Sequence, residues 1–137
     1  MWNSVVVVPA APSGQGTVEV VSTAKSLTHI KTVYKVHLQV YRRWVYPRIV
    51  QRGASCKLTD VDSFFFPGEC KVTMYWYNWR GDSHGGLYVK AEVDVENCIN
   101  LPFLNPGCWA NAHVTLEIYV NGNGAWLRKS NGKVVRK

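Results

Sequence analysis

The sequence lacks a long apolar run. Its most apolar short stretch, residues 5–8, ends at Pro9, well short of the roughly 20 residues that a membrane-spanning helix needs. No Lys or Arg precedes this stretch, so the N-terminal residues do not have the pattern of a secretory signal peptide. Two explanations stay open: a protein made and used without export, or a mature chain behind an added Met.

Acidic residues are also scarce. Asp and Glu number 9 against 16 Lys and Arg, which gives a net charge of +7 and suggests anionic partners. Hydrophobic residues make up 47% of the chain, a fraction too high for an intrinsically disordered protein. The length of 137 residues is typical of one domain, which we expect to span 1–137 with residues 1–16 as a candidate extended arm.

No segment of ten or more residues has a helical period with caps. The dominant period is two, which is typical of strands with one buried face. It is clearest in residues 32–43, 87–96 and 113–120. Residues 71–79 carry large side chains on both faces. Weaker strands are expected in residues 4–8, 17–23, 45–50, 55–61, 125–129 and 133–136. The sequence therefore predicts an all-β domain, a single-domain antiparallel β-sandwich (jelly-roll-like) or barrel of about eight to ten short strands.

Cysteines are few, and none has the close spacing of a zinc-ligand pair. The four are Cys56, Cys70, Cys98 and Cys108, each beside a turn-rich stretch. Pairing neighbours, Cys56 with Cys70 and Cys98 with Cys108, closes one loop in each case. Two disulfides are predicted, with this neighbour pairing expected among the three possible connectivities, and four free thiols used as small core side chains remain the alternative.

Catalytic motifs are missing as well. The sequence has no nucleophile elbow, no phosphate-binding loop and no dinucleotide-binding glycine pattern. Asp82, Ser83 and His84 are adjacent, whereas a catalytic triad needs side chains that converge from separate elements. We therefore expect no enzyme activity, no cofactor and no metal site.

Basic and aromatic residues are interleaved along several predicted strands. Lys and Arg neutralise phosphates and ring faces stack on bases, so this mixture favours single-stranded nucleic acid. Alternation places Arg43 on the face of Lys35 and turns Arg42 to the other side. Rings that simply face a second sheet are the competing interpretation. The candidate nucleic-acid-binding residues are Lys31, Lys35, Tyr41, Arg42, Arg43, Trp44, Arg48, Lys71 and Tyr75.

One short motif is of a kind that a cell-surface receptor can bind. Arg80, Gly81 and Asp82 form an Arg-Gly-Asp tripeptide in a predicted hairpin loop, where an integrin-binding loop would present it. Loops attract these residue types in any case, so chance is the favoured explanation.

Two functional hypotheses follow. The first is a non-enzymatic structural or assembly protein, most plausibly a viral or phage coat protein. It forms a homo-oligomer, contacts nucleic acid through a basic-aromatic sheet face, and resides in a virion or in the cytoplasm. The second is an extracellular two-disulfide β-protein of the lectin, toxin or effector type that binds a carbohydrate or a host receptor. Neither hypothesis includes a membrane span.

Overall fold

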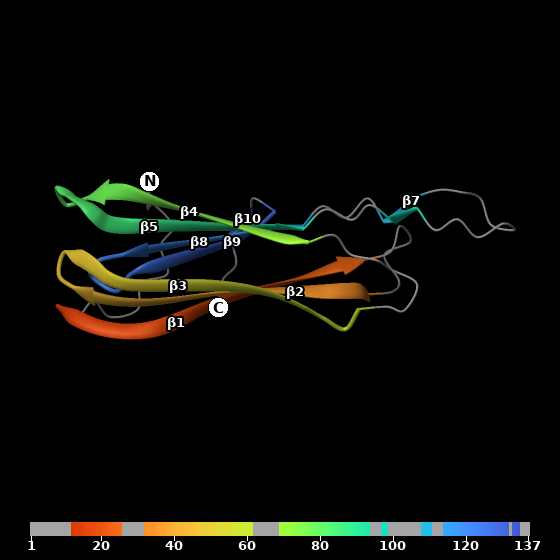
Figure 1. Ribbon diagram of the computed structural model, residues 1–137, viewed down its shortest axis with the longest axis horizontal. Coiled ribbons are helices and arrows are strands. Elements are labelled where there is room, and N and C mark those ends of the chain that lie inside the picture. The colour runs from red at the N-terminus through yellow and green to blue at the C-terminus, as the bar shows by residue number, and fades with distance from the viewer. Residues whose placement is uncertain are drawn as a thin grey trace, which may run out of the picture.

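The computed structural model describes residues 12–25, 32–61, 69–93, 97–98, 108–110, 114–131 and 133–134, and all regular structure in these ranges is β-strand. The all-β prediction is confirmed. Two antiparallel sheets lie face to face as two layers (Figure 1). The strands are β1 (Ser13–Lys25), β2 (Thr32–Val45), β3 (Arg48–Thr59), β4 (Cys70–Trp79), β5 (Asp82–Val93), β6 (Asn97–Cys98), β7 (Cys108–Ala110), β8 (Val114–Asn121), β9 (Trp126–Ser130) and β10 (Lys133–Val134).

Strand order defines the two layers. The three-stranded sheet has the order β1-β2-β3, and the five-stranded sheet has the order β10-β9-β8-β5-β4. Strands β6 and β7 form a separate two-stranded ribbon. β1 packs on β8 and β9, whereas β3 packs on β4 and β5. Each layer therefore has one face turned toward the other layer and one outer face.

The core lies between the two sheets and follows the period-two pattern of the sequence. Alternate residues of β2, β5 and β8 point inward and are fully buried, and the intervening residues point outward. Burial of such branched and aromatic side chains is the main favourable term in folding. The buried set includes Tyr34, Val36, Leu38, Val40, Leu87, Val89, Val93, Leu116, Ile118 and Val120.

The first strand begins earlier than the sequence indicated. Residues 13–16, assigned to the candidate arm, pair with β2 from Ser13 opposite Val45 to Gly16 opposite Arg42. Gly14 lies so close to the Trp44 ring that a Cβ at this position would be 2.7 Å from it. The missing side chain thus leaves room for the indole. Residues 1–11, with the predicted strand at 4–8, lie outside the described residues.

Two turns differ from the sequence-based expectation. Residues 45–50 were expected to be a strand, but Tyr46 and Pro47, joined by a cis peptide bond, form the hairpin turn between β2 and β3. Arg80, Gly81 and Asp82 were expected to lie in a hairpin loop, whereas the turn holds only Arg80 and Gly81, and Asp82 begins β5. Both turn residues have positive φ, as tight hairpin turns of this type require.

A disulfide links the two sheets at one edge. Cys56 on β3 bonds to Cys70 on β4 with Cα atoms 6.2 Å apart, which confirms the predicted pairing. Backbone register places Cys98 opposite Cys108 in the β6–β7 ribbon. The side chains of these two residues lie outside the described part of the chain, so their disulfide stays a prediction. Residues 62–68 and 99–107 also lie outside the described residues.

Candidate functional site

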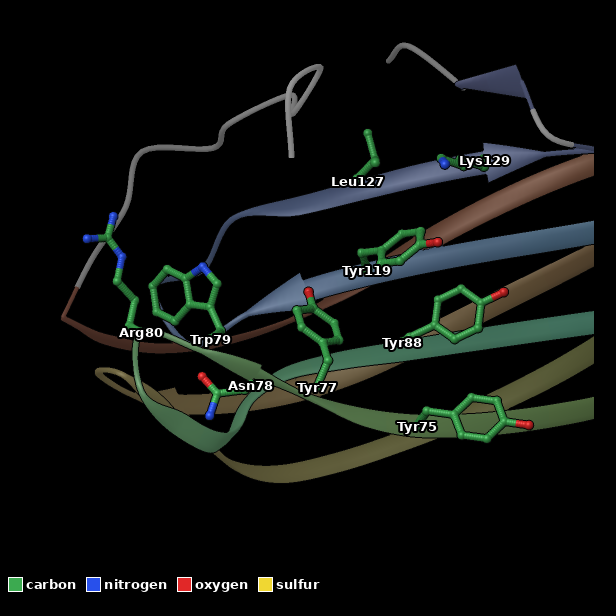
Figure 2. A pocket seen from close by; sticks show the side chains of 9 residues that line it. All are labelled: Tyr75, Tyr77, Asn78, Trp79, Arg80, Tyr88, Tyr119, Leu127 and Lys129. Carbon is green, nitrogen blue, oxygen red and sulfur yellow. The ribbon is translucent and has the colours of Figure 1, made fainter. Parts of the chain in front are cut away.

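The outer face of the five-stranded sheet carries a groove lined largely by aromatic side chains. Its volume is about 680 Å³, and Figure 2 shows the rings of β4, β5 and β8 beside Leu127 and Lys129 of β9. We call it the aromatic groove, and its lining residues are Tyr75, Tyr77, Asn78, Trp79, Arg80, Tyr88, Tyr119, Leu127 and Lys129.

Strand register assembles the centre of this groove. Tyr75 on β4 lies opposite Tyr88 on β5, Tyr88 lies opposite Tyr119 on β8, and Tyr119 lies opposite Leu127 on β9. We call these four residues the tyrosine row. Directly opposed side chains on one face are near neighbours. Three residues distant in sequence therefore form one band of rings across the sheet.

The rings of the row contact each other at angles typical of aromatic pairs. Tyr75 and Tyr88 are stacked, with centroids 6.1 Å apart and planes 20° from parallel. Tyr88 and Tyr119 are 4.7 Å apart and tilted by 46°. Tyr75 at the outer end is 60% exposed. The row thus ends in a ring with ample accessible surface.

Glu117 is the acidic partner of the tyrosine row. The Tyr88 hydroxyl donates a 2.6 Å hydrogen bond to Glu117 Oε2. Partial burial raises the pKa of Tyr88 well above its ordinary value, and the hydrogen bond and charge of Glu117 raise it further. Burial and the same carboxylate also raise the pKa of Tyr119. Both hydroxyls therefore stay neutral at physiological pH.

Tyr77 extends the ring surface toward the β4–β5 turn. Its hydroxyl donates a 2.7 Å hydrogen bond to Asn121 Oδ1, and its ring lies edge-on to Tyr119 at 6.3 Å. The residue opposite Tyr77 on β5 is Gly86, and a Cβ there would overlap the Tyr77 ring. Glycine at this position lets the ring lie over the backbone of β5.

Cations flank the groove at both ends (Figure 2). The guanidinium carbon of Arg80 lies 5.3 Å from the centroid of the Trp79 ring, and Lys129 Nζ lies 5.4 Å from that of Tyr119. These are cation–π contacts, which hold the positive charges against the ring surface.

The predicted nucleic-acid-binding residues do not form one surface. Lys71 and Tyr75 lie on the outer face of the five-stranded sheet. Lys35, Tyr41 and Arg43 share the outer face of the three-stranded sheet, on the opposite side of the sandwich. Lys31 lies outside the described residues.

The outer face of the three-stranded sheet is a network of paired polar groups. Lys35 forms an ion pair with Asp60 at 3.2 Å. Gln39 donates a hydrogen bond to Glu19, and the Tyr41 hydroxyl donates one to Gln15. The polar groups of Lys35, Gln39 and Tyr41 on this face are therefore already bonded to neighbouring residues of the protein.

Arg42 and Trp44, both predicted to contact nucleic acid, lie between the sheets. Arg42 is 5% exposed and Trp44 is 8% exposed. Arg42 Nη2 donates a hydrogen bond to the Gly124 carbonyl, and its guanidinium lies over the Trp44 ring. Neither side chain is presented on an outer face of the sandwich.

The remaining candidates gather at one end of the sandwich. Asp82 accepts a hydrogen bond from the backbone N–H of His84 and lies 3.7 Å from the Nε of Arg48. Arg80 is turned onto Trp79. Within the Arg-Gly-Asp tripeptide, both charged side chains are thus engaged by neighbouring groups of the chain.

Tyr88, Tyr119 and Lys129 are the main groove residues that sequence reasoning did not select. On its own strand, Tyr88 alternates with Val89 and occupies a polar face, and Tyr119 does the same beside Ile118. The one indication of the groove in the sequence was that β4, β5 and β8 each carry an aromatic residue on the face that alternation makes polar. Strand order and register were needed to combine them.

Comparisons with known proteins give no assignment: no protein-family model, curated protein or solved structure matches the chain. Within the described ranges, no helix is long and apolar enough to cross a membrane. Nor do three or more His, Cys, Asp or Glu side chains of these ranges gather as a metal site.

Proposed function

We propose that this protein is a non-enzymatic binding protein whose aromatic groove holds single-stranded nucleic acid, and that it acts as the subunit of an assembly such as a viral or phage coat. The observation that carries the proposal is the tyrosine row, which lies in a groove that Arg80 and Lys129 flank. Bases stack on exposed rings while cations neutralise the phosphates between them. The net charge of +7 favours the same ligand.

The assembly part of the proposal rests on a second surface. Apolar side chains are exposed at and around the β2–β3 hairpin, where Val45 is 50%, Tyr46 50% and Val50 42% exposed. A neighbouring copy of the chain that covers this hairpin would remove these groups from water. Multi-angle light scattering of the purified protein, with and without nucleic acid, tests whether copies associate.

A carbohydrate is the second candidate ligand, and Glu117 is the observation that favours it. This carboxylate lies among the rings, where it repels phosphate and accepts hydrogen bonds from hydroxyl groups. Salt dependence separates the two ligands. Counterion release makes nucleic-acid affinity fall steeply with salt, whereas a neutral sugar has no such term.

The binding test compares two tyrosines on opposite faces of the sandwich. Fluorescence anisotropy with a labelled single-stranded homopolymer measures affinity at two salt concentrations. Tyr75→Ala should weaken binding by about fivefold or more, because stacking contributes roughly 1–3 kcal/mol per base. Tyr41→Ala, an exposed tyrosine on the three-stranded sheet, is the control and should bind like the wild type.

A matched pair of cations tests the phosphate contacts. Lys129→Gln should lower affinity for all sequences and reduce the salt slope by about 1, whereas Arg43→Gln should change neither. Equal losses in the two tyrosine variants, or no binding at low salt, would contradict the proposal. Salt-independent binding to a neutral polysaccharide that Tyr75→Ala abolishes would favour the carbohydrate hypothesis.

A further inference from the structure

A second groove opens at the edge of the sandwich where β1 faces β9. It has a volume of about 320 Å³, and we call it the edge groove. Its lining differs from that of the aromatic groove because it contains two arginines and two tryptophans that point between the sheets. The lining residues that matter here are Gln15, Arg42, Trp44, Gly124, Trp126 and Arg128.

Arg128 has one side of its guanidinium engaged and the other side without a partner. Its Nη1 donates a 2.8 Å hydrogen bond to the Glu19 carbonyl of β1. Its Nε and Nη2 are buried and have no hydrogen-bond partner in the described structure. These two N–H groups lie on the same side of the guanidinium, where they form the fork that binds a carboxylate or phosphate through two parallel hydrogen bonds.

Arg42 adds a second cation with an unpaired N–H. Its Nη2 donates to the Gly124 carbonyl at 3.1 Å, while its Nε is buried and unpaired within the described ranges. Desolvation by burial lowers its pKa, and no carboxylate of the described residues forms an ion pair with it. Burying a charge without a counter-ion costs desolvation free energy, and an anion bound beside Arg42 would offset that cost.

Glu19 also lines the edge groove, but its carboxylate is bonded to residues of the three-stranded sheet. Glu19 Oε2 accepts a 2.8 Å hydrogen bond from Gln39 and lies 3.8 Å from His37, on the outer face of the three-stranded sheet. The chain therefore brings two guanidinium groups to the groove and turns the carboxylate of Glu19 toward the outer face of the three-stranded sheet. The indoles of Trp44 and Trp126, each stacked with one of the arginines, provide apolar walls.

We propose that the edge groove binds the oxyanion group of a small organic molecule, a phosphate or a carboxylate, between Arg128 and Arg42. The Nε–Nη2 fork of Arg128 holds two oxygens, and Arg42 Nε donates to the same group. The apolar part of the ligand lies against the indoles. This site is separate from the aromatic groove and does not depend on the function proposed for it.

Thermal unfolding in the presence of inorganic phosphate, and separately of acetate, tests the proposal. Sodium chloride holds the ionic strength constant, and the two anions distinguish a phosphate site from a carboxylate site. A ligand that binds the folded state raises the melting temperature, so saturating anion should raise it by several degrees in the wild type. Arg128→Met should abolish the rise, because it removes the fork and keeps an apolar side chain of similar length.

Two further variants are included, one in case Arg128→Met does not fold and one as a control for loss of a positive charge. Arg128→Lys retains the charge without the fork, so anion affinity measured by calorimetry should fall at least tenfold even if Arg128→Met does not fold. Arg43→Met removes a neighbouring exposed cation from the outer face and should keep the full rise. No rise with either anion, or an equal rise in all three variants, would overturn the proposal. Tyr75→Ala should keep the rise, so this test and that of the aromatic groove can fail independently.

Discussion

Tyr88 and Glu117 illustrate how single side chains set the chemistry of the aromatic groove. The hydroxyl of Tyr88 donates to the carboxylate of Glu117, which also raises the pKa of Tyr119. The pair fixes the middle ring of the tyrosine row in place. It also places one negative charge where a phosphate would be repelled. Under the proposed function, bases would lie flat on the rings and the phosphates would lie away from Glu117, toward the cations that flank the groove.

The raised pKa values make stability sensitive to alkaline pH. Below pH about 10, Tyr88 and Tyr119 are protonated in both the folded and unfolded states. Above that pH, the unfolded chain loses protons that the folded state retains, so the free energy of unfolding falls as pH rises. Urea unfolding near pH 9 and pH 11 should show a smaller fall for Tyr88→Phe than for the wild type.

Glu117→Gln provides the complementary measurement. Ultraviolet titration of tyrosine absorbance should detect ionisation of Tyr88 at lower pH in this variant, although burial still holds the pKa above its usual range. Tyr41→Phe, which removes a hydroxyl on the opposite sheet, is the control for general alkaline effects. An unchanged titration in Glu117→Gln would show that the carboxylate does not control the Tyr88 proton.

At the scale of elements, pairs of facing strands decide which side chains meet. Gly86 on β5 lies opposite Tyr77 on β4, and the ring occupies the space that a side chain at Gly86 would take. The hydroxyl of Tyr77 then reaches Asn121 on β8, beyond β5. One glycine thus lets a single aromatic side chain span three strands.

Gly86→Ala should displace the Tyr77 ring and break its hydrogen bond to Asn121. Overpacking of this kind typically costs about 1–3 kcal/mol, which chemical denaturation measures as a lower midpoint. Gly53→Ala on β3 is the matched control, because a Cβ at Gly53 meets nothing within 4 Å. The control should change stability by no more than roughly 0.5 kcal/mol. Similar losses in both variants would indicate that backbone flexibility, and not the ring, determines the effect.

The sequence predicted the strands and their inner faces well but could not predict the site. Alternation around Leu38 and Ile118 identifies buried faces because the period of a strand is fixed by its backbone. Register depends on contacts between residues far apart in the chain, so nothing local to Tyr88 indicated Tyr75 and Tyr119 as its neighbours. Alternation alone turned Arg42 away from the face of Arg43, and the structure shows that this other side of β2 is the interior, where Arg42 is buried.

At the scale of the whole molecule, the disulfide closes one edge of the sandwich. Cys56 and Cys70 are 14 positions apart and join the edge strands β3 and β4 of the two sheets. The bond restricts the unfolded chain and fixes which strands of the two layers lie together. The predicted pairing was correct because the two residues bracket one connection between consecutive strands.

Replacing both residues, Cys56→Ala with Cys70→Ala, should lower the free energy of unfolding by about 3 kcal/mol, the value of the chain-entropy model for a loop of about 15 residues. Urea denaturation of the double variant against the wild type measures the loss, and circular dichroism should still report β-structure. Substitution is preferable to a reductant, which would also act on any bond between Cys98 and Cys108. An unchanged unfolding midpoint would contradict this contribution.

The two long edges of the sandwich are held by different kinds of bond. One has the covalent link between β3 and β4, and the other has the hydrogen bonds of Arg128 to β1 and of Arg42 to the turn before β9. Hydrogen bonds open and re-form in thermal motion, whereas the disulfide holds. Any partial separation of the layers would therefore begin at the β1–β9 edge, while the disulfide keeps β3 and β4 together. The edge groove lies at the opposite, β1–β9 edge of the sandwich, where a bound anion would hold the two layers together.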